Sequence, residues 1–133
     1  MLMPPVSRYM TRCPRTIPRT MTLADAHQLM QQDHVRHLPV VDGDELCGIV
    51  SERDLHVLES AGRIDPATTP VEQAMTARPF IVTGDTALDE VVEIMGEHKY
   101  GSVVIEGHDG VEGIFTAVDA CRVLAELLRR ATA

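Results

Sequence analysis

The sequence contains no tryptophan and only two tyrosines and two phenylalanines. A core without large aromatic rings has to be built from valine, isoleucine, leucine and methionine, and a flat ligand would be held mainly between aliphatic side chains. The scarcity of aromatic rings also leaves few platforms on which single-stranded bases could stack. This part of the composition argues against single-strand binding.

Basic residues are also scarce. Twelve Lys and Arg residues face twenty Asp and Glu residues, which gives a formal net charge of −8. Because affinity for nucleic acids depends on neutralising phosphates with cations, this balance argues against a broad nucleic-acid surface. A small basic pocket remains compatible with it.

The three cysteines, Cys13, Cys47 and Cys121, are odd in number and far apart. We therefore expect reduced thiols, neither a disulfide framework nor a zinc site. No run approaches the roughly 18 apolar residues that a membrane-spanning helix needs, and the first ten residues lack the basic and apolar regions of a signal peptide. These absences predict a cytoplasmic protein without a membrane segment.

What the sequence does contain is a direct repeat of 65 residues. Residues 6–58 align with residues 71–123 without a gap, and the apolar pattern follows the same register. The identical pairs are Val6/Val71, Met10/Met75, Thr11/Thr76, Pro14/Pro79, Leu23/Leu88, Met30/Met95, Asp44/Asp109, Gly48/Gly113, Ile49/Ile114 and Asp54/Asp119. Two copies are too few for a solenoid. We therefore expect a closed pseudo-twofold pair around a central cleft.

Each copy predicts the same order of elements, α-β-α-β-β-α, and the fold class is α+β. In the first copy these elements are expected at 4–10, 15–18, 22–34, 37–42, 46–51 and after Ser51. In the second copy they are expected at 69–75, 80–83, 87–99, 102–106, 111–116 and after Thr116. The predicted division of the chain is a first repeat at 1–60, a connector at 61–69 and a second repeat with a C-terminal helix at 70–133.

The two longer helices are predicted from apolar residues that recur on one helical face. The residues expected on this face are Leu23, Ala26, Met30 and, at its edge, His27 in the first copy, and Leu88, Val91, Val92 and Met95 in the second.

A hydroxyl residue followed three positions later by an aspartate ends the Gly-Ile strand of each copy. The two pairs are Ser51/Asp54 and Thr116/Asp119. The pattern [ST]-x-x-[DE] is also a capping box, in which the hydroxyl and the carboxylate satisfy backbone N–H groups at a helix start. It occurs three more times, at Thr22/Asp25, Thr69/Glu72 and Thr86/Asp89. Spacing alone therefore predicts no more than helix caps.

The setting of the two strand-end pairs favours a ligand as well. A strand that runs into a helix N-terminus presents free N–H groups and the positive end of the helix dipole, which favour phosphate or carboxylate. A hydroxyl at this point can donate to phosphate oxygens, and an aspartate one turn later can accept from both hydroxyls of a ribose.

The segments VRHLPVVDGDELCGIVSERDL and KYGSVVIEGHDGVEGIFTAVDA resemble a tandem pair of CBS domains, a Bateman module, and the match extends from about Val6 to Leu124. The resemblance implies two packed repeats that bind adenosine-containing ligands such as AMP, ADP, ATP or S-adenosylmethionine in the cleft between them. It assigns phosphate to Ser51 and Thr116 and ribose to Asp54 and Asp119. It also implies a homodimer in the form of a four-repeat disc.

The resemblance further implies that residues before the long helix line the base pocket, which are Thr16 and Ile17 in one copy and Ile81 and Val82 in the other. Residues before the middle strand, Arg36 and His37, are expected near phosphate.

The two copies are chemically unequal. Arg36, His37 and Arg53 gather on the first repeat, whereas the second has Gly101, Ser102 and Val118 at those positions. We therefore expect the Ser51 site to be the stronger one for a charged nucleotide.

Besides ligand binding, the two functions to consider are catalysis and protein interaction without a ligand. The chain carries no nucleophile elbow, phosphate-binding glycine loop or zinc motif, so we expect neither an enzyme nor a required cofactor or metal. The main hypothesis is a regulatory protein that binds an adenosine ligand and signals to an unidentified protein in trans. The alternative is a ligand-free interaction or dimerisation module, in which the Ser/Thr-Asp pairs are only helix caps.

Overall fold

The chain folds into two compact units, each with its own sheet and helices. The computed structural model describes residues 2–12 and 15–132. One unit, called here the Ser51 unit, is Arg15–Pro79. The other, the Thr116 unit, combines the described residues before position 13 with those from Phe80 onwards. The α+β class is confirmed, with one four-stranded sheet in each unit.

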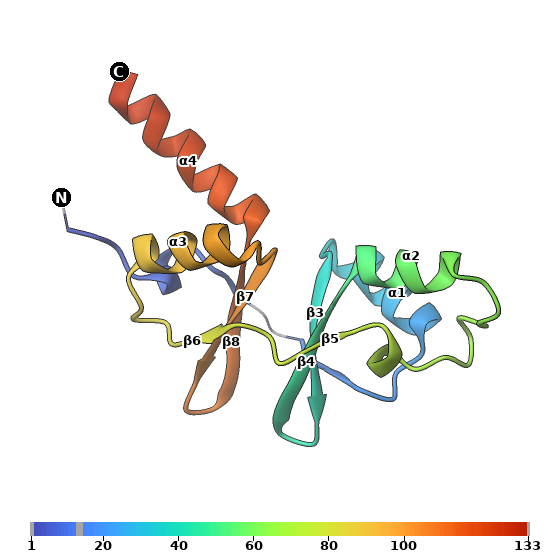
Figure 1. Ribbon diagram of the computed structural model, residues 1–133. Coiled ribbons are helices and arrows are strands. Elements are labelled where there is room, and N and C mark those ends of the chain that lie inside the picture. Colours follow the sequence, from blue (N-terminus) through green and yellow to red (C-terminus); the bar gives the residue numbers. More distant parts are fainter. Residues whose placement is uncertain (1, 13–14, 133) are drawn as a thin grey trace. The chain divides into compact units, whose positions relative to one another are not determined.

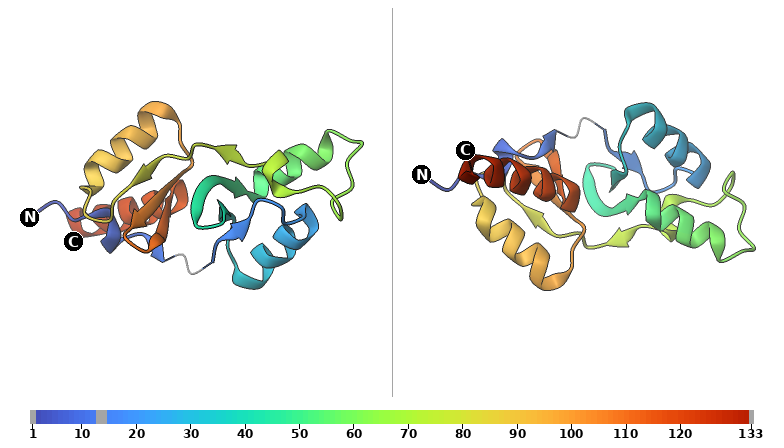
Figure 2. Two further views of the ribbon diagram at one scale, coloured as in Figure 1. Left: turned by 90° about the horizontal axis from the view of Figure 1, so that it is seen from below. Right: turned by 90° about the horizontal axis from the view of Figure 1, so that it is seen from above.

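The Ser51 unit is built on a sheet with the strand order β2-β3-β4-β5. The strands are β2 (Ile17–Pro18), β3 (His37–Asp42), β4 (Glu45–Ser51) and β5 (Thr76–Ala77). The pair β2 and β3 is parallel, and the other pairs are antiparallel. The helices are α1 (Leu23–Asp33) and α2 (Glu52–Ser60), and a 3-10 turn, η2, covers Val71–Gln73 (Figure 2).

The Thr116 unit repeats this arrangement with the order β1-β8-β7-β6. Its strands are β1 (Thr11–Arg12), β6 (Ile81–Val82), β7 (Ser102–Gly107) and β8 (Gly110–Thr116). Its helices are α3 (Leu88–His98) and α4 (Ala117–Thr132), and its 3-10 turn, η1, covers Val6–Arg8. The last turns of α4 extend away from the sheet (Figure 1).

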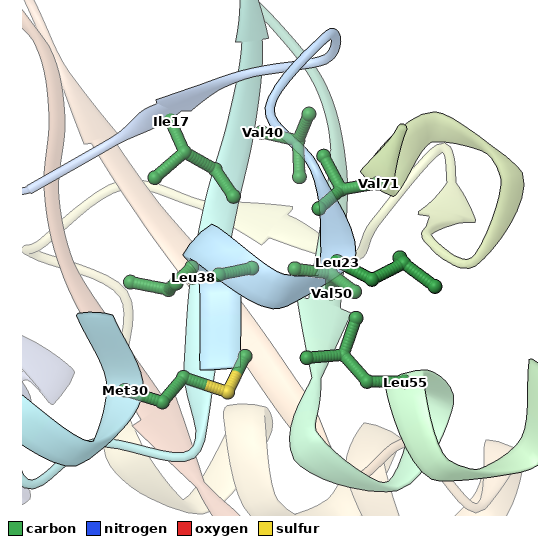
Figure 3. Packing of buried hydrophobic residues seen from close by; sticks show 9 residues of the cluster. Ile17, Leu23, Met30, Leu38, Val40, Val50, Leu55 and Val71 are labelled. Atoms are coloured by element: carbon green, nitrogen blue, oxygen red, sulfur yellow. The ribbon is translucent and has the colours of Figure 1, made fainter. Parts of the chain in front are cut away.

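The first segment of each sequence repeat belongs to the unit formed by the other repeat. Strand β1 pairs with β8, and β5 pairs with β4. Val6 lies in the core cluster of the Thr116 unit, and Val71 lies in that of the Ser51 unit (Figure 3). The sequence repeats and the compact units therefore divide the chain differently, and each hydrophobic core needs residues from both repeats.

An ion-pair network links the segment that contains η2 and β5, which comes from the second repeat, to the sheet of the Ser51 unit. The guanidinium of Arg19 lies 2.7 Å from Glu72 of η2 and 3.3 Å from Asp42 at the end of β3. The carboxylate of Glu72, followed by that of Asp42, raises the pKa of Arg19. This arrangement ties the turn from the second repeat to the sheet of the first.

The predicted helical faces are largely confirmed. Leu23, Ala26 and Met30 of α1 are buried, and so are the three α3 residues Leu88, Val91 and Met95. Val92 was also expected in the core, but its side chain is 38% exposed. It lies one residue beyond Val91, at the edge of the buried face.

Two of the predicted caps are wrong. The hydroxyl of Thr69 donates to the carbonyl oxygen of Asp65, and the expected short helix is the 3-10 turn that begins only at Val71. The N-cap of α3 is Ala87, whose methyl side chain cannot cap the helix, and the hydroxyl of Thr86, one residue earlier, contacts that of Thr83. Both threonine hydroxyls therefore contact residues of the preceding loop and do not cap a helix.

The cap at Thr22 forms as predicted, whereas two short edge strands are additions to the predicted elements. Thr22 caps α1 as expected and accepts a hydrogen bond from the backbone N–H of Asp25. The edge strands β1 and β5 were not predicted. Within residues 2–12 and 15–132, no helix is both long and apolar enough to cross a bilayer.

Candidate functional site

Ser51 lies at the junction of β4 and α2 and caps the helix. Its hydroxyl accepts a 3.0 Å hydrogen bond from the backbone N–H of Asp54, and the Oδ2 of Asp54 accepts a 2.8 Å bond from the N–H of Ser51. The predicted capping box is therefore confirmed. The helix start fixes the hydroxyl and the carboxylate side by side.

The cap uses only part of the acceptor capacity of Asp54. A carboxylate offers about four lone-pair positions on its two oxygens. Within the described ranges, the second oxygen, Oδ1, has no hydrogen-bond partner, and the side chain is half-buried. Asp54 can cap α2 and still accept hydrogen bonds from a ligand.

Three basic residues have backbone positions next to this helix start. The β3–β4 register places His37 opposite Ser51, and the N–H of Glu52 donates to the carbonyl oxygen of Arg36 at 2.9 Å. Arg53 follows in the first turn of α2. Arg36 and Arg53 are exposed, and in the part of the chain that the structure describes neither forms an ion pair. Two unpaired cations thus flank the N-terminus of α2, which itself favours anions.

The Thr116 unit has the same cap with different surroundings. The N–H of Thr116 donates to Asp119 Oδ2 at 3.0 Å, and the N–H of Asp119 donates to the Thr116 hydroxyl at 3.2 Å. Asp119 is only 7% exposed. Ser102 lies opposite Thr116, and the N–H of Ala117 donates to Gly101, so the positions of His37 and Arg36 carry no cation here.

Asp119 receives one more donor, which sequence reasoning missed. The hydroxyl of Thr11 lies 3.3 Å from Oδ1 and 3.4 Å from Oδ2 of this carboxylate. Arg122 approaches Oδ1 at 3.7 Å from an exposed position. Thr11 and Thr76 are an identical pair in the repeat, which was the only signal in the sequence for these positions. No local pattern predicted that either threonine would lie beside an aspartate.

The four residues expected to line a base pocket divide into two groups. Ile17 is 1% exposed and belongs to the core of the Ser51 unit, and Val82 packs against the core of the Thr116 unit. Thr16 and Ile81, at equivalent positions of the repeat, are exposed. Because neighbouring residues in an extended chain point to opposite sides, only Thr16 and Ile81 offer side chains to a ligand.

The described residues contain no group of three or more His, Cys, Asp or Glu side chains placed to hold a metal ion. Two histidines of the Ser51 unit, His27 and His56, contact other side chains. His27 of α1 lies 2.7 Å from Glu59 of α2 and stacks on His56. This cluster joins the two helices.

Comparisons with known sequences match both repeats. The family model described as the CBS domain matches residues 6–58 and 71–126. The uncharacterized protein YlbB of Bacillus subtilis (strain 168) is 35% identical over 92 residues, which are 68% of this chain and 62% of that protein. The aligned region therefore spans less than two thirds of the length of YlbB.

Solved structures with the same fold support the family match. AcuB from Vibrio cholerae has a TM-score of 0.80 and 36% identity, over 96% of this chain and 95% of that chain. CBSX2, solved in complex with AMP, has a TM-score of 0.77 and 25% identity, over 92% and 97% of the two chains. The resemblance to a tandem CBS pair is thereby confirmed. With two matches that together span most of its length, the chain belongs to the CBS domain family.

Proposed function

We propose that the protein is a regulatory module without catalytic activity that binds an adenosine-containing ligand at the Ser51 site. The observation that carries this proposal is that, among the described residues, Asp54 Oδ1 has no hydrogen-bond donor and that Arg36 and Arg53, at the same helix start, form no ion pair. The AMP complex of CBSX2, a 25% identical relative in structure, supports the ligand class. Cytoplasmic residence remains part of the proposal, on the basis of three widely spaced cysteines.

The ligand's hydroxyl groups and its phosphate would use different parts of the site. Ribose hydroxyls donate hydrogen bonds, and Asp54 Oδ1 is the available acceptor. Phosphate oxygens accept them from Arg36, Arg53 and the N-terminal turn of α2, where charge-assisted hydrogen bonds are strongest. Among the candidate ligands AMP, ADP, ATP and S-adenosylmethionine, this charge distribution favours the phosphate-bearing ones. Thr16 would stand nearest to the base, as the family resemblance implies.

A second part of the proposal is a homodimer formed through α4. Val118, Leu124, Leu127 and Leu128 are between 42% and 56% exposed. Helical spacing gathers Leu124, Leu127 and Leu128 on one side of α4, whereas Val118 falls on the other side with Arg122, Glu126, Arg129 and Arg130. An exposed apolar face of this kind is typical of an interaction surface. It also supports the alternative function, an interaction module without a ligand.

Ligand binding would control a partner by stabilising one conformation over another, because a ligand shifts an equilibrium only by its difference in affinity. The partner that receives this signal is expected to be a separate protein.

A ligand panel with matched cap variants tests the proposed site. AMP at 100 times its dissociation constant should stabilise the folded protein by about 2.7 kcal/mol, visible as a rise in melting temperature. Asp54→Ala should abolish this rise and lower the stability of the free protein by about 1 kcal/mol, because it also removes the acceptor of the Ser51 N–H in the capping box.

Thr22→Ala is the control, because it removes a comparable cap from α1 without touching the Ser51 site. This variant should lose a similar stability and keep the AMP response. If Asp54→Ala keeps the response as well, the Ser51 pair is only a cap and the interaction module is the better interpretation.

A further inference from the structure

The hydroxyl of Thr11 contacts the second motif aspartate from a strand that precedes it by more than a hundred residues. Thr11 lies in β1, opposite Ile114 of β8, and β8 leads directly to the helix that carries Asp119. The side-chain oxygen of Thr11 is 3.3 Å from Oδ1 and 3.4 Å from Oδ2 of Asp119. The exchanged N-terminal segment therefore reaches the motif of the second repeat.

Several donors lie around the carboxylate of Asp119. Oδ2 receives the N–H of Thr116 at 3.0 Å and its hydroxyl at 3.2 Å. The one hydroxyl proton of Thr11 is shared between Oδ1 and Oδ2, and Oδ1 also lies 3.7 Å from the guanidinium of Arg122. With about four lone-pair positions available and 7% of the residue exposed, Asp119 has little capacity left for a ribose.

The Ser51 unit provides an internal comparison. Thr76 lies opposite Ile49 in the same register in which Thr11 lies opposite Ile114. Within the described residues, Thr76 makes no hydrogen bond to Asp54, whose Oδ1 is left without a donor. The two threonines are identical in the repeat, but only one of them engages its aspartate.

We propose that the Thr11 hydroxyl occupies the position on Asp119 that a ligand hydroxyl would take, and thereby closes the Thr116 site while the Ser51 site stays open. This inference rests on the proposed adenosine-ligand function and specifies its regulation. It makes Thr11 a specificity-determining residue: an adenosine ligand must displace an internal hydroxyl at one site and not at the other. Thr11 is exposed in a two-residue edge strand that pairs with β8 through backbone groups, so its hydroxyl can be removed without unfolding β1.

The test is the number of AMP molecules bound per chain, measured by isothermal titration calorimetry and equilibrium dialysis. The wild type should bind one. Thr11→Ala, which removes the hydroxyl and opens the space beside Asp119, should bind two. Thr11→Ser keeps the hydroxyl and should bind one.

Two further variants make the assignment specific. Thr76→Ala changes the equivalent position of the other unit and should leave one site, because Thr76 does not engage Asp54. In the double variant with Thr11→Ala and Asp54→Ala, one site should remain and should be lost on adding Asp119→Ala.

The outcomes separate this inference from the proposed function. One site in the wild type and one in Thr11→Ala would overturn the role of Thr11 and leave the Ser51 site standing. Two sites in the wild type would also overturn it. No site in the wild type and one in Thr11→Ala would support the inference and overturn the proposal for Ser51. No binding to either protein would overturn both.

Discussion

Gly48 and Met75 are packed so closely that no side chain fits at position 48. A β-carbon added to Gly48 would lie 2.6 Å from the sulfur of Met75 and 2.8 Å from the carbonyl oxygen of Thr76. Gly113 stands in the same relation to Met10 and its neighbour in β1. The absence of a side chain at Gly48 thus allows β5 to lie close to β4, and its absence at Gly113 allows β1 to lie close to β8.

Gly48→Ala should therefore destabilise the protein by about 1–3 kcal/mol, because the added methyl group must push β5 away from β4. Urea unfolding measures this loss. Gly96→Ala is the matched control: it lies within α3 with nothing within 4 Å of the new carbon, and should stabilise by about 0.5–1 kcal/mol. Equal stability of the two variants would show that β5 does not pack against Gly48.

The second prediction concerns the charges beside Ser51. Arg36→Gln and Arg53→Gln should each weaken AMP binding by about threefold to tenfold, equivalent to about 0.7–1.4 kcal/mol. Binding of adenosine, which lacks the phosphate, should change little. Calorimetric titration with both ligands distinguishes a phosphate contact from a general loss of structure.

Arg129→Gln serves as the control for these two substitutions. Arg129 is exposed near the end of α4, far along the chain from Ser51. AMP affinity should be unchanged in this variant. If Arg129→Gln lost as much AMP affinity as Arg36→Gln, the effect would come from the net charge of the protein and not from a contact between Arg36 and the phosphate.

The third prediction tests the apolar face of α4. Leu124→Glu should convert a homodimer to a monomer, because it introduces a charge into the face formed with Leu127 and Leu128. Light scattering after size-exclusion chromatography gives the mass. Arg122→Glu, on the charged side of the same helix, should remain dimeric. A wild type that is already monomeric at high concentration would contradict the dimer proposal.

The fourth prediction uses two cysteines as reporters. Cys121 is exposed on α4, and we expect iodoacetamide to modify it rapidly at low protein concentration and slowly once the dimer forms. Cys47 should react slowly at both concentrations at pH 8. Burial, and then the nearby Asp42 carboxylate, raises the pKa of the Cys47 thiol above its ordinary value, so little reactive thiolate is present.

Mass spectrometry of peptides separates the two sites. Raising the pH should accelerate modification of Cys47, since a higher pH is needed to ionise it, and unfolding in urea should remove its protection. Concentration-independent modification of Cys121 would argue that α4 does not form the interface.

Local patterns in the sequence were sufficient for the main elements. The periodicity around Leu23 and Met30 predicted α1, and the hydroxyl-aspartate spacing predicted the cap at Ser51. Caps at Thr69 and Thr86 failed, because a hydroxyl three residues before an acid can equally bond a nearby loop carbonyl or hydroxyl. Spacing records which partners are possible, and the surrounding backbone selects among them.

The sequence by itself determined the duplicated α+β plan, the family, and the chemical inequality that places Arg36 and Arg53 on one copy only. These features follow from residue identity and short-range periodicity. Only the tertiary structure decided that β1 and β5 complete the opposite units, and that, among the described residues, Thr11 engages Asp119 whereas Thr76 makes no hydrogen bond to Asp54. Such contacts join residues far apart in the chain, so they depend on how strands pair and cores close, which no local pattern specifies.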